Sequence, residues 1–300
     1  MYGCWNARAV GLDLSAEQTI EVAAKAGFEG VDLLVRDIAE SGADADELRR
    51  RMDDLGLQGG GWSLPVNWRN DAETFEADLK QLPRRAKTAA RLGLFRTGTW
   101  VRFESEPVAS EELGNEGAGE RISEASTALQ IERLGRIARM LDDHGSRIGL
   151  EIIGSRSERT GRGVPLVGTY AELARRFAAL REAHRNVGVL VDAFHLFASG
   201  ESLDAAMAWG PSSVVWIHLS DPAHGDRSTL RDVERDLPGE SPSSLCAGLL
   251  AGLAERGCQG PVTVEPLWRC RSLEGLNPLQ MAIKTREALR RVWPSTLLFR

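Results

Sequence analysis

The feature that most constrains the fold of this chain is a short apolar run followed by an amphipathic segment, a unit that recurs eight times along the 300 residues. The apolar runs are almost continuous in hydrophobic character, which is typical of parallel strands buried on both faces. The eight predicted strands are Tyr2–Trp5, Gly30–Val35, Leu57–Leu64, Phe95–Val101, Ile148–Ile153, Val187–Phe194, Val214–Leu219 and Pro261–Val264. Eight strand–helix units predict an α/β fold, a single (β/α)8 TIM barrel.

Signals that do not depend on hydrophobicity delimit several of the helices between these strands. Three pairs have the spacing of a capping box: Ser15 with Gln18, Asp44 with Glu47, and Thr169 with Glu172. Four glycines stand where a helix should end in a left-handed residue: Gly27, Gly56, Gly93 and Gly257. Further helices are expected around 71–92, 123–144, 202–209, 242–256 and 277–292. A doubly wound sheet is the alternative, but eight complete units would be unusual for it.

No Pro/Ser-rich linker interrupts the repeat, so residues 1–300 are predicted to form one domain. Two connections are longer than a barrel requires: 102–122, which is rich in glutamate, and 154–168, which carries three arginines. Both follow strands on the face where such barrels carry out chemistry. They are interpreted either as lids that approach each other through opposite charge or as two solvated surface loops.

Charge and composition exclude several classes of partner. The net charge is −6 and the pI is near 5.6, so no basic field for nucleic-acid phosphates is expected. No stretch approaches the ~20 apolar residues of a membrane span, and no signal peptide is recognised. The four cysteines contain no C-x-x-C pair and are interpreted as reduced thiols. These features predict a soluble, cytoplasmic protein without a nucleic-acid or membrane partner.

Four consecutive predicted strands in the second half of the chain deliver a titratable residue to their carboxyl ends: Glu151, Asp192, His218 and Glu265. An unpaired carboxylate beside a buried strand end costs on the order of several kcal/mol, which a bound cation would relieve. Three carboxylates and one imidazole suit a divalent ion, with Mn²⁺ favoured and Mg²⁺, Co²⁺ or Zn²⁺ as alternatives. Any one of these residues could instead cap a loop or pair with an arginine, but their recurrence favours a shared metal site.

The same segments carry a resemblance to a known family. The motifs are LEIIG at 150–154, VDAFHLF at 191–197, WIHLSD at 216–221, DLPGE at 236–240 and GPVTVEP at 260–266. In these motifs, and through most of its length, the chain resembles the xylose-isomerase-like barrels often named sugar phosphate isomerase/epimerases. The resemblance implies that Glu151, Asp192, His218 and Glu265 bind one divalent metal and that both glutamates move protons. It also implies that His195 contacts a substrate hydroxyl, whereas the residues alone favour a packed histidine.

The residues expected to bind the substrate depart in part from the family pattern. His224 stands six residues after His218, where epimerases of the family can place a substrate-binding arginine. Arg235 or Arg227 is the alternative donor to the substrate. Trp100, at the end of the predicted fourth strand, is expected to form an apolar wall over a sugar ring or simply to pack.

The site so assembled suits proton abstraction next to a carbonyl, with the metal stabilising an enediolate. Glu151 on one face and Glu265 on the other would invert a carbon centre, so the predicted function is a metal-dependent keto-sugar isomerase/epimerase. Expulsion of a β-hydroxyl from the same intermediate would make it an inosose- or keto-sugar dehydratase.

Two further classes are less favoured. Apurinic-site endonucleases share the superfamily but use a histidine-rich three-zinc cluster, and this chain has only five histidines. A noncatalytic sugar-binding barrel or enzyme subunit is disfavoured because both acid/base glutamates are present. A homo-oligomer is possible, with the tail at 293–300 packing on a neighbour or on its own barrel.

Overall fold

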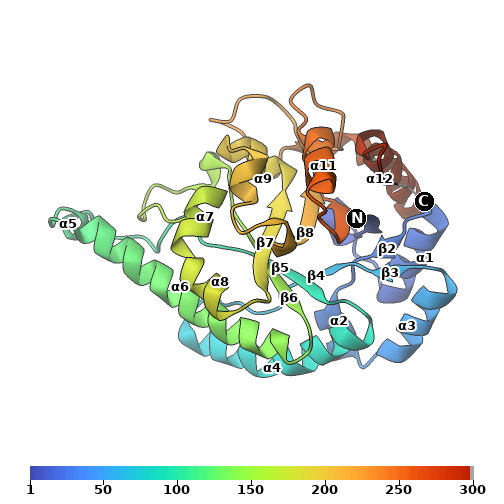
Figure 1. Cartoon of the computed structure of the whole chain (residues 1–300), viewed down its shortest axis with the longest axis horizontal. Coiled ribbons are helices and arrows are strands. Elements are labelled where there is room, and N and C mark those ends of the chain that lie inside the picture. Colours follow the sequence, from blue (N-terminus) through green and yellow to red (C-terminus); the bar gives the residue numbers. More distant parts are fainter. Residues whose placement is uncertain (298–300) are drawn as a thin grey trace.

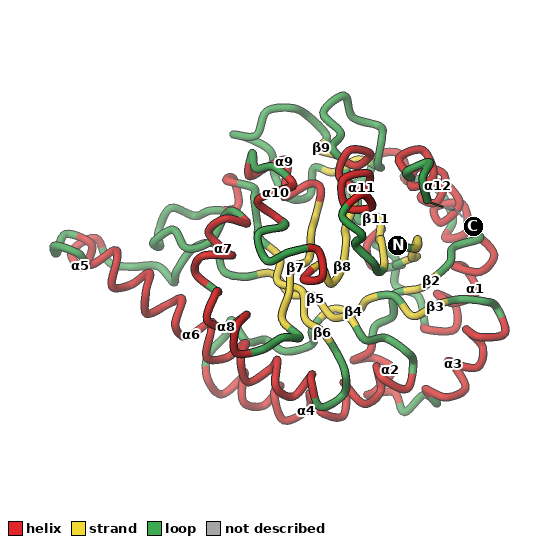
Figure 2. The backbone as a smooth tube through the Cα atoms, viewed as in Figure 1, coloured by secondary structure: helices red, strands yellow, loops and turns green. Residues whose placement is uncertain are grey.

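Parallel strands, arranged around a common axis, form the inner wall of the molecule (Figure 2). The computed structural model describes residues 1–297, so the end of the 293–300 tail lies outside the described residues. The strands are β1 Tyr2–Trp5, β2 Gly30–Val31, β3 Gln58–Gly59, β4 Gly61–Ser63, β5 Arg96–Trp100, β6 Arg147–Glu151, β7 Val187–Asp192, β8 Val214–Leu219 and β11 Pro261–Val264. Their order in the sheet is β3-β2-β1-β11-β8-β7-β6-β5-β4, and neighbours pair in parallel.

The barrel is closed through its third strand, which is split in two. Gly60 alone separates β3 from β4; β3 pairs with β2 and β4 pairs with β5. The two halves together therefore count as one strand of the barrel, which gives eight strands in all. The predicted single TIM barrel is confirmed.

Helices surround the strands, as Figure 1 shows. They are α1 Ala16–Ala26, α2 Val35–Ser41, α3 Ala45–Asp54, α4 Ala72–Arg91, α5 Ser110–Leu113, α6 Ala118–Asp142, α7 Tyr170–Arg176, α8 Ala178–Ala183, α9 Ala193–Ser199, α10 Leu203–Ala206, α11 Cys246–Glu255 and α12 Pro278–Val292. A small antiparallel pair, β9 Asp221–Pro222 and β10 Arg235–Asp236, lies beyond β8.

The predicted helix signals are confirmed in part. Ser15 and Gln18 form a complete capping box at the start of α1. Thr169 caps α7, but the Glu172 side chain accepts from the Gly168 N–H instead of that of Thr169. The box predicted for Asp44 is wrong, because its carboxylate accepts from Asp46 N–H. The four predicted terminal glycines all have positive φ angles, between 69° and 80°.

Some predicted boundaries are also wrong. The second strand, expected to reach Val35, ends at Val31, because α2 begins at Val35. The helix expected at 242–256 begins only at Cys246, since the Asp221 carboxylate accepts from the Ser241 N–H and the Ser244 hydroxyl and holds this segment as a turn. The expected loop 102–122 contains α5 and the first residues of α6.

The segments after β5 and β6 are in contact. The Glu104 carboxylate accepts hydrogen bonds of 2.8 Å from the backbone N–H groups of Thr160 and Gly163. The Thr160 hydroxyl also donates to Glu104, so this carboxylate binds the neighbouring segment through peptide and hydroxyl groups and not through an arginine. That these segments act as lids stays a prediction.

The buried Trp216 side chain packs between strands of the barrel. A Cβ atom added at Gly61 would lie 2.3 Å from the Trp216 indole, and one added at Gly98 would lie 3.1 Å from it. At Gly61 the absence of a side chain therefore makes room for the Trp216 indole, which packs against His218 inside the barrel.

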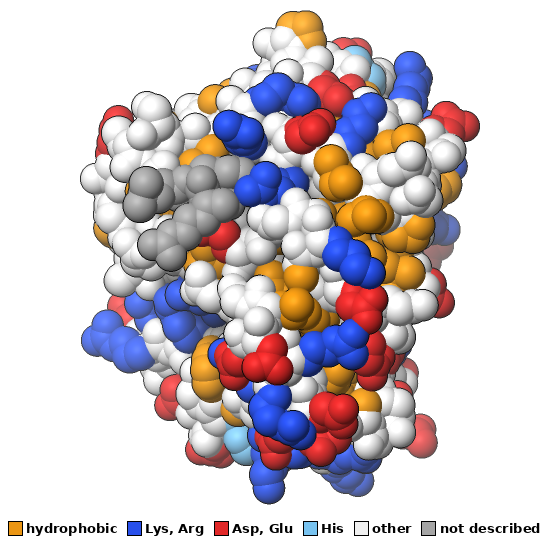
Figure 3. All heavy atoms as spheres, turned by 90° about the vertical axis from the view of Figure 1, so that its right-hand side faces the viewer, with side chains coloured by type: hydrophobic (Ala, Val, Ile, Leu, Met, Phe, Trp, Pro, Cys, Tyr) orange, Lys and Arg blue, Asp and Glu red, His pale blue; other side chains and the backbone are white. Residues whose placement is uncertain are grey.

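Surface and hydropathy add two observations. Acidic and basic side chains are interspersed on the face in Figure 3, and the described residues form no continuous basic field there. Among the described residues, no helix combines the length and apolar character that a membrane span requires. Oligomeric state and cellular location stay predictions.

Candidate metal centre

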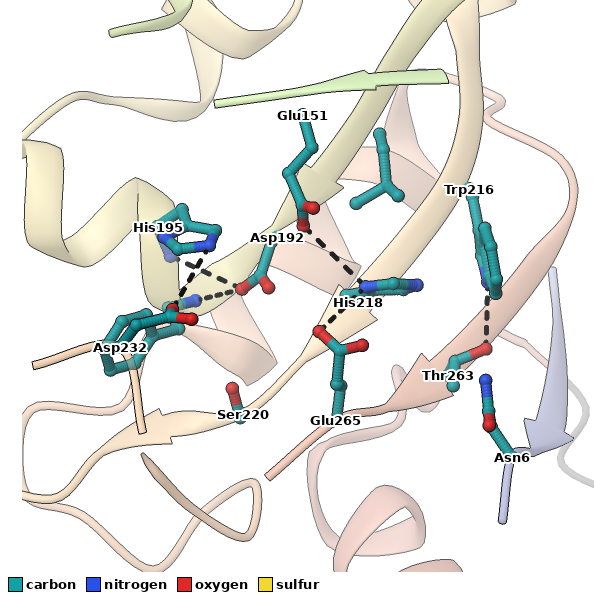
Figure 4. Close-up of polar contacts among 12 residues, drawn as sticks. Asn6, Glu151, Asp192, His195, Trp216, His218, Ser220, Asp232, Thr263 and Glu265 are labelled. Carbon is teal, nitrogen blue, oxygen red and sulfur yellow. Dashed lines mark hydrogen bonds and ion pairs between the residues drawn. The ribbon is translucent and has the colours of Figure 1, made fainter. Parts of the chain in front are cut away.

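Four side chains converge where the strands of the second half of the barrel end. Glu151 ends β6, Asp192 ends β7, His218 is next to last in β8, and Glu265 directly follows β11. Asp192 pairs in register with His218, so neighbouring strands bring these side chains to one level. One donor atom from each of the four lies within 4.8 Å of the others. Figure 4 shows the four side chains pointing toward one another.

His218 is the central member of this cluster. Its Nδ1 lies 3.1 Å from Glu265 Oε2 and 3.8 Å from Glu151 Oε1. Burial alone would lower the pKa of His218, but the two carboxylates outweigh burial and raise it to about 9.

Glu151 is the least satisfied member of the cluster. Its Oε1 is buried and has no hydrogen-bond partner among the described residues. Burial raises the pKa of Glu151 well above its usual range, because the charged form loses hydration. A buried oxygen without a donor, in a set of three carboxylates and one imidazole, fits a divalent cation that prefers oxygen ligands.

Arg235 reaches the cluster from β10. Its Nη1 lies 2.8 Å from Asp192 Oδ2 and 3.4 Å from Glu265 Oε2, and its Nη2 donates to Asp232 Oδ1 at 2.6 Å. Burial would raise the pKa of Asp192, but the Arg235 guanidinium lowers it. Arg235 neutralises one of the three clustered carboxylates, so two negative charges remain for a divalent cation to balance once Glu151 and His218 have lost their protons.

His195 is buried beside the same arginine. The Asp192 carboxylate caps α9 by accepting from the backbone N–H groups of Phe194 and His195. His195 Nδ1 lies 3.2 Å from the Gly154 N–H and accepts from it, so this nitrogen carries no proton. Nε2 then carries the proton and faces Asp232 Oδ1 at 3.5 Å. Burial lowers the pKa of His195, which favours this neutral form.

The other two predicted substrate-binding residues lie outside this contact network. Trp100 ends β5, pairs in register with Glu151 and is 37% exposed. The guanidinium of Arg69 stacks 3.7 Å from its ring centroid. His224 lies between β9 and β10, with Nε2 3.4 Å from Glu234 Oε2. Within residues 1–297, the structure brings His224 into no hydrogen bond with the four clustered residues.

Comparison with known proteins places this chain in a family. The sequence profile described as xylose isomerase-like TIM barrel matches residues 20–292. The chain belongs to the xylose isomerase-like TIM barrel family. A search of curated protein sequences found no match.

Several solved structures share the fold of this family member. A xylose isomerase domain protein from Alicyclobacillus acidocaldarius is 24% identical, with 97% of each chain covered and a TM-score of 0.80. The IolI protein with a bound zinc atom is 18% identical, with 97% of this chain and 98% of that one covered and a TM-score of 0.76. D-psicose 3-epimerase in the presence of D-fructose is 18% identical over the same shares, with a TM-score of 0.71.

Two residues of this xylose isomerase-like barrel were not found by sequence reasoning. Asp232 holds Arg235 and faces His195, but it lies in a loop without any strand-end signal. Asp32 directly follows β2, so it has the same signal as the four clustered residues. Burial raises the pKa of Asp32 to about 6, yet both its oxygens accept hydrogen bonds.

Proposed function

We propose that this chain is a divalent-metal-dependent isomerase or epimerase of keto sugars. The observation that carries the proposal is the convergence of three carboxylates and one imidazole within 4.8 Å at the mouth of the barrel. The names of two neighbours support it, since one is an epimerase seen with D-fructose and another holds zinc.

Glu151, Asp192, His218 and Glu265 are the residues that would hold the cation. When bound, a divalent cation polarises a carbonyl oxygen and stabilises the negative charge that develops on it. Oxygen-rich donor sets favour Mn²⁺, while the zinc in the IolI structure keeps Zn²⁺ as an alternative.

The two glutamates lie in different surroundings, which suggests different roles. Glu265 Oε2 lies 3.1 Å from His218 Nδ1 and 3.4 Å from Arg235 Nη1, and Glu265 is proposed as the base that removes the proton beside the carbonyl. Burial favours the protonated form of Glu151, which is proposed to return a proton to the other face. Transfer from one face to the other inverts the carbon, as an epimerase requires.

Arg235 and His195 are proposed to orient the substrate. Their Nη2 and Nε2 atoms lie 3.2 Å apart beside the cluster. Because both are donors they do not bond to each other; both face Asp232 Oδ1, and each can donate to a substrate hydroxyl or keto oxygen that takes the place of this acceptor. Trp100 is proposed as a wall for the sugar ring and His224 as a more distant contact.

A dehydratase would share the first proton abstraction, so it is the alternative outcome at the same site. Among the described residues, only one cluster of side chains could hold a metal ion. This disfavours the three-zinc chemistry of apurinic-site endonucleases. That cluster contains both proposed acid/base glutamates, and their presence disfavours a noncatalytic subunit.

The test is hydrogen exchange with solvent. The Mn²⁺-loaded protein is incubated in D2O with D-fructose and D-psicose among a panel of ketoses, and deuterium on carbon is measured by NMR. Incorporation next to the carbonyl is expected, and product analysis then separates epimerase, isomerase and dehydratase. No incorporation from any ketose by the metal-loaded protein would overturn the proposal, and three zinc ions per chain would point to DNA repair.

A further inference from the structure

The imidazole of His218 lacks the support that metal-binding histidines usually have. The second ring N–H of such a histidine normally donates a hydrogen bond to a carboxylate, a carbonyl or water, which fixes the orientation of the ring. His218 Nε2 is buried and has no hydrogen-bond partner among the described residues. In this structure Nδ1 is hydrogen-bonded to Glu265, but once Nδ1 binds a cation the ring has to be held by a contact other than a hydrogen bond.

That contact is the Trp216 indole. The two ring centroids are 4.5 Å apart and the planes meet at 82°, an edge-to-face arrangement. Figure 4 shows the second nitrogen of His218 directed to the side on which Trp216 lies. Since both side chains come from β8, the orientation of the imidazole depends on where the indole is held.

A chain of hydrogen bonds holds the indole in turn. Trp216 Nε1 donates to Thr263 Oγ1 at 2.9 Å, and Thr263 Oγ1 lies 2.6 Å from Asp32 Oδ2. Indole is a donor only, so the threonine oxygen must accept from it and use its single proton toward Asp32. The direction of the chain is thereby fixed and requires an acceptor at position 32.

Asp32 is a rigid anchor for this chain. It is 3% exposed, and its Oδ1 accepts from the Gly61 N–H at 2.6 Å while Asn6 Nδ2 lies 3.3 Å from Oδ2. Its partners come from β4, from the end of β1 and, through Thr263, from β11. Thr263 also pairs in register with His218, so the anchor and the metal candidate share neighbouring strands.

We propose that Asp32 and Thr263 are positioning residues of the metal centre: they lock Trp216 in the barrel, and Trp216 fixes the imidazole of His218 so that Nδ1 faces Glu151 and Glu265. This inference rests on the proposed metal-dependent function. It gives a role to a buried carboxylate that none of the proposed proton transfers uses.

The test compares two variants at one position with a matched control. Thr263→Val keeps the shape of the side chain but removes the hydroxyl, whereas Thr263→Ser keeps the hydroxyl. Thr97→Val is the control, because Thr97 is equally buried on β5 and donates to Trp62 O at 2.8 Å, away from the cluster. The readouts are Co²⁺ affinity by calorimetry and the visible spectrum of bound Co²⁺, neither of which needs a substrate.

Thr263→Val is expected to weaken Co²⁺ binding about tenfold and to alter the spectrum, as loss of a supporting partner of a metal ligand does. Thr263→Ser and Thr97→Val are expected to keep the wild-type affinity and spectrum. Asp32→Asn, which replaces one acceptor oxygen by a donor, gives a second route if Thr263→Val does not fold, and a weakened, altered Co²⁺ site is expected there too.

A folded Thr263→Val or Asp32→Asn protein with wild-type affinity and spectrum would overturn the positioning role while leaving the metal site intact. A wild-type protein that binds no Co²⁺ would instead overturn the metal site, and the positioning role with it.

Discussion

On the side of the barrel mouth formed by β1 to β5, the buried carboxylate of Asp32 has both oxygens hydrogen-bonded. On the side formed by β6 to β11, Glu151 keeps a buried oxygen without a partner among the described residues. Both carboxylates stand at the carboxyl end of a strand. The difference teaches that a carboxylate at a strand end is a stronger candidate metal ligand when it has an oxygen that accepts no hydrogen bond from the protein.

The two sides also differ in the contacts of their buried or half-buried arginines. Arg235 is shared between Asp192 and Asp232, inside the cluster. Arg69 has hydrogen bonds to Thr99 Oγ1 and to the backbone oxygen of Trp100, and it stacks on the indole. One side therefore concentrates charge, while the other presents an aromatic wall.

The largest expected effect is loss of proton exchange when a glutamate on the β6 to β11 side is replaced. Glu151→Gln or Glu265→Gln should lower deuterium exchange into the ketose by about 10² to 10⁴-fold, since each removes a proton-transfer group. Glu76→Gln, which loses only a surface pair with Arg136, is the control and should retain wild-type exchange. Retention of half the exchange rate by both cluster variants would contradict the proposed roles.

The next prediction concerns the release of protons when the cluster binds a metal ion. Because the pKa of His218 is raised to about 9, the metal-free protein carries a proton there at pH 7, and a metal ligand must lose it. Mn²⁺ binding should release at least one proton at pH 7, from His218, with Glu151 adding to the release, and the contribution of His218 should make the affinity rise with pH until about pH 9, above which His218 is already neutral. Calorimetry at pH 7 in buffers of different ionisation enthalpy measures the release. A heat that does not depend on the buffer would count against it.

A smaller effect is expected from the histidines of the substrate-binding set. His195→Gln should lower kcat/KM about tenfold, because glutamine cannot present an acceptor to the Gly154 N–H and a donor beside Arg235 in the geometry of the imidazole. His224→Gln should change kcat/KM less than about twofold, since a partly exposed pair with Glu234 contributes little. Steady-state kinetics with the best ketose compares the two, and equal losses would show that contact with the cluster does not decide their roles.

On the aromatic side, the effect is expected in KM alone. Trp100→Ala should raise KM a few-fold with little change in kcat, because it removes a wall that binds ground state and transition state alike. Trp100→Phe keeps an aromatic ring and should lie between wild type and the alanine variant. A fall in kcat with unchanged KM would place Trp100 in the chemistry instead.

The repeat of apolar runs was sufficient to predict the barrel, and the strand-end rule was sufficient to bring Glu151, Asp192, His218 and Glu265 together. Both depend on period and topology, which a sequence carries directly. Asp32 was missed because Leu33, Leu34 and Val35 continue the apolar run and hide the true end of β2. Asp232 was missed because the β9–β10 pair has two-residue strands, too short for any periodicity.

The origin of Arg235 has a consequence for how such a protein diversifies. The four metal candidates come from the barrel strands and their ends, whereas Arg235 enters from a hairpin beyond β8. Insertions and deletions in 223–234 can move or replace this arginine without shifting any barrel strand. For the isomerase or epimerase we propose, selection for a new sugar can thus act on the hairpin while the strands preserve the reaction, so proteins with one chemistry and many substrates are accessible through small changes in one segment.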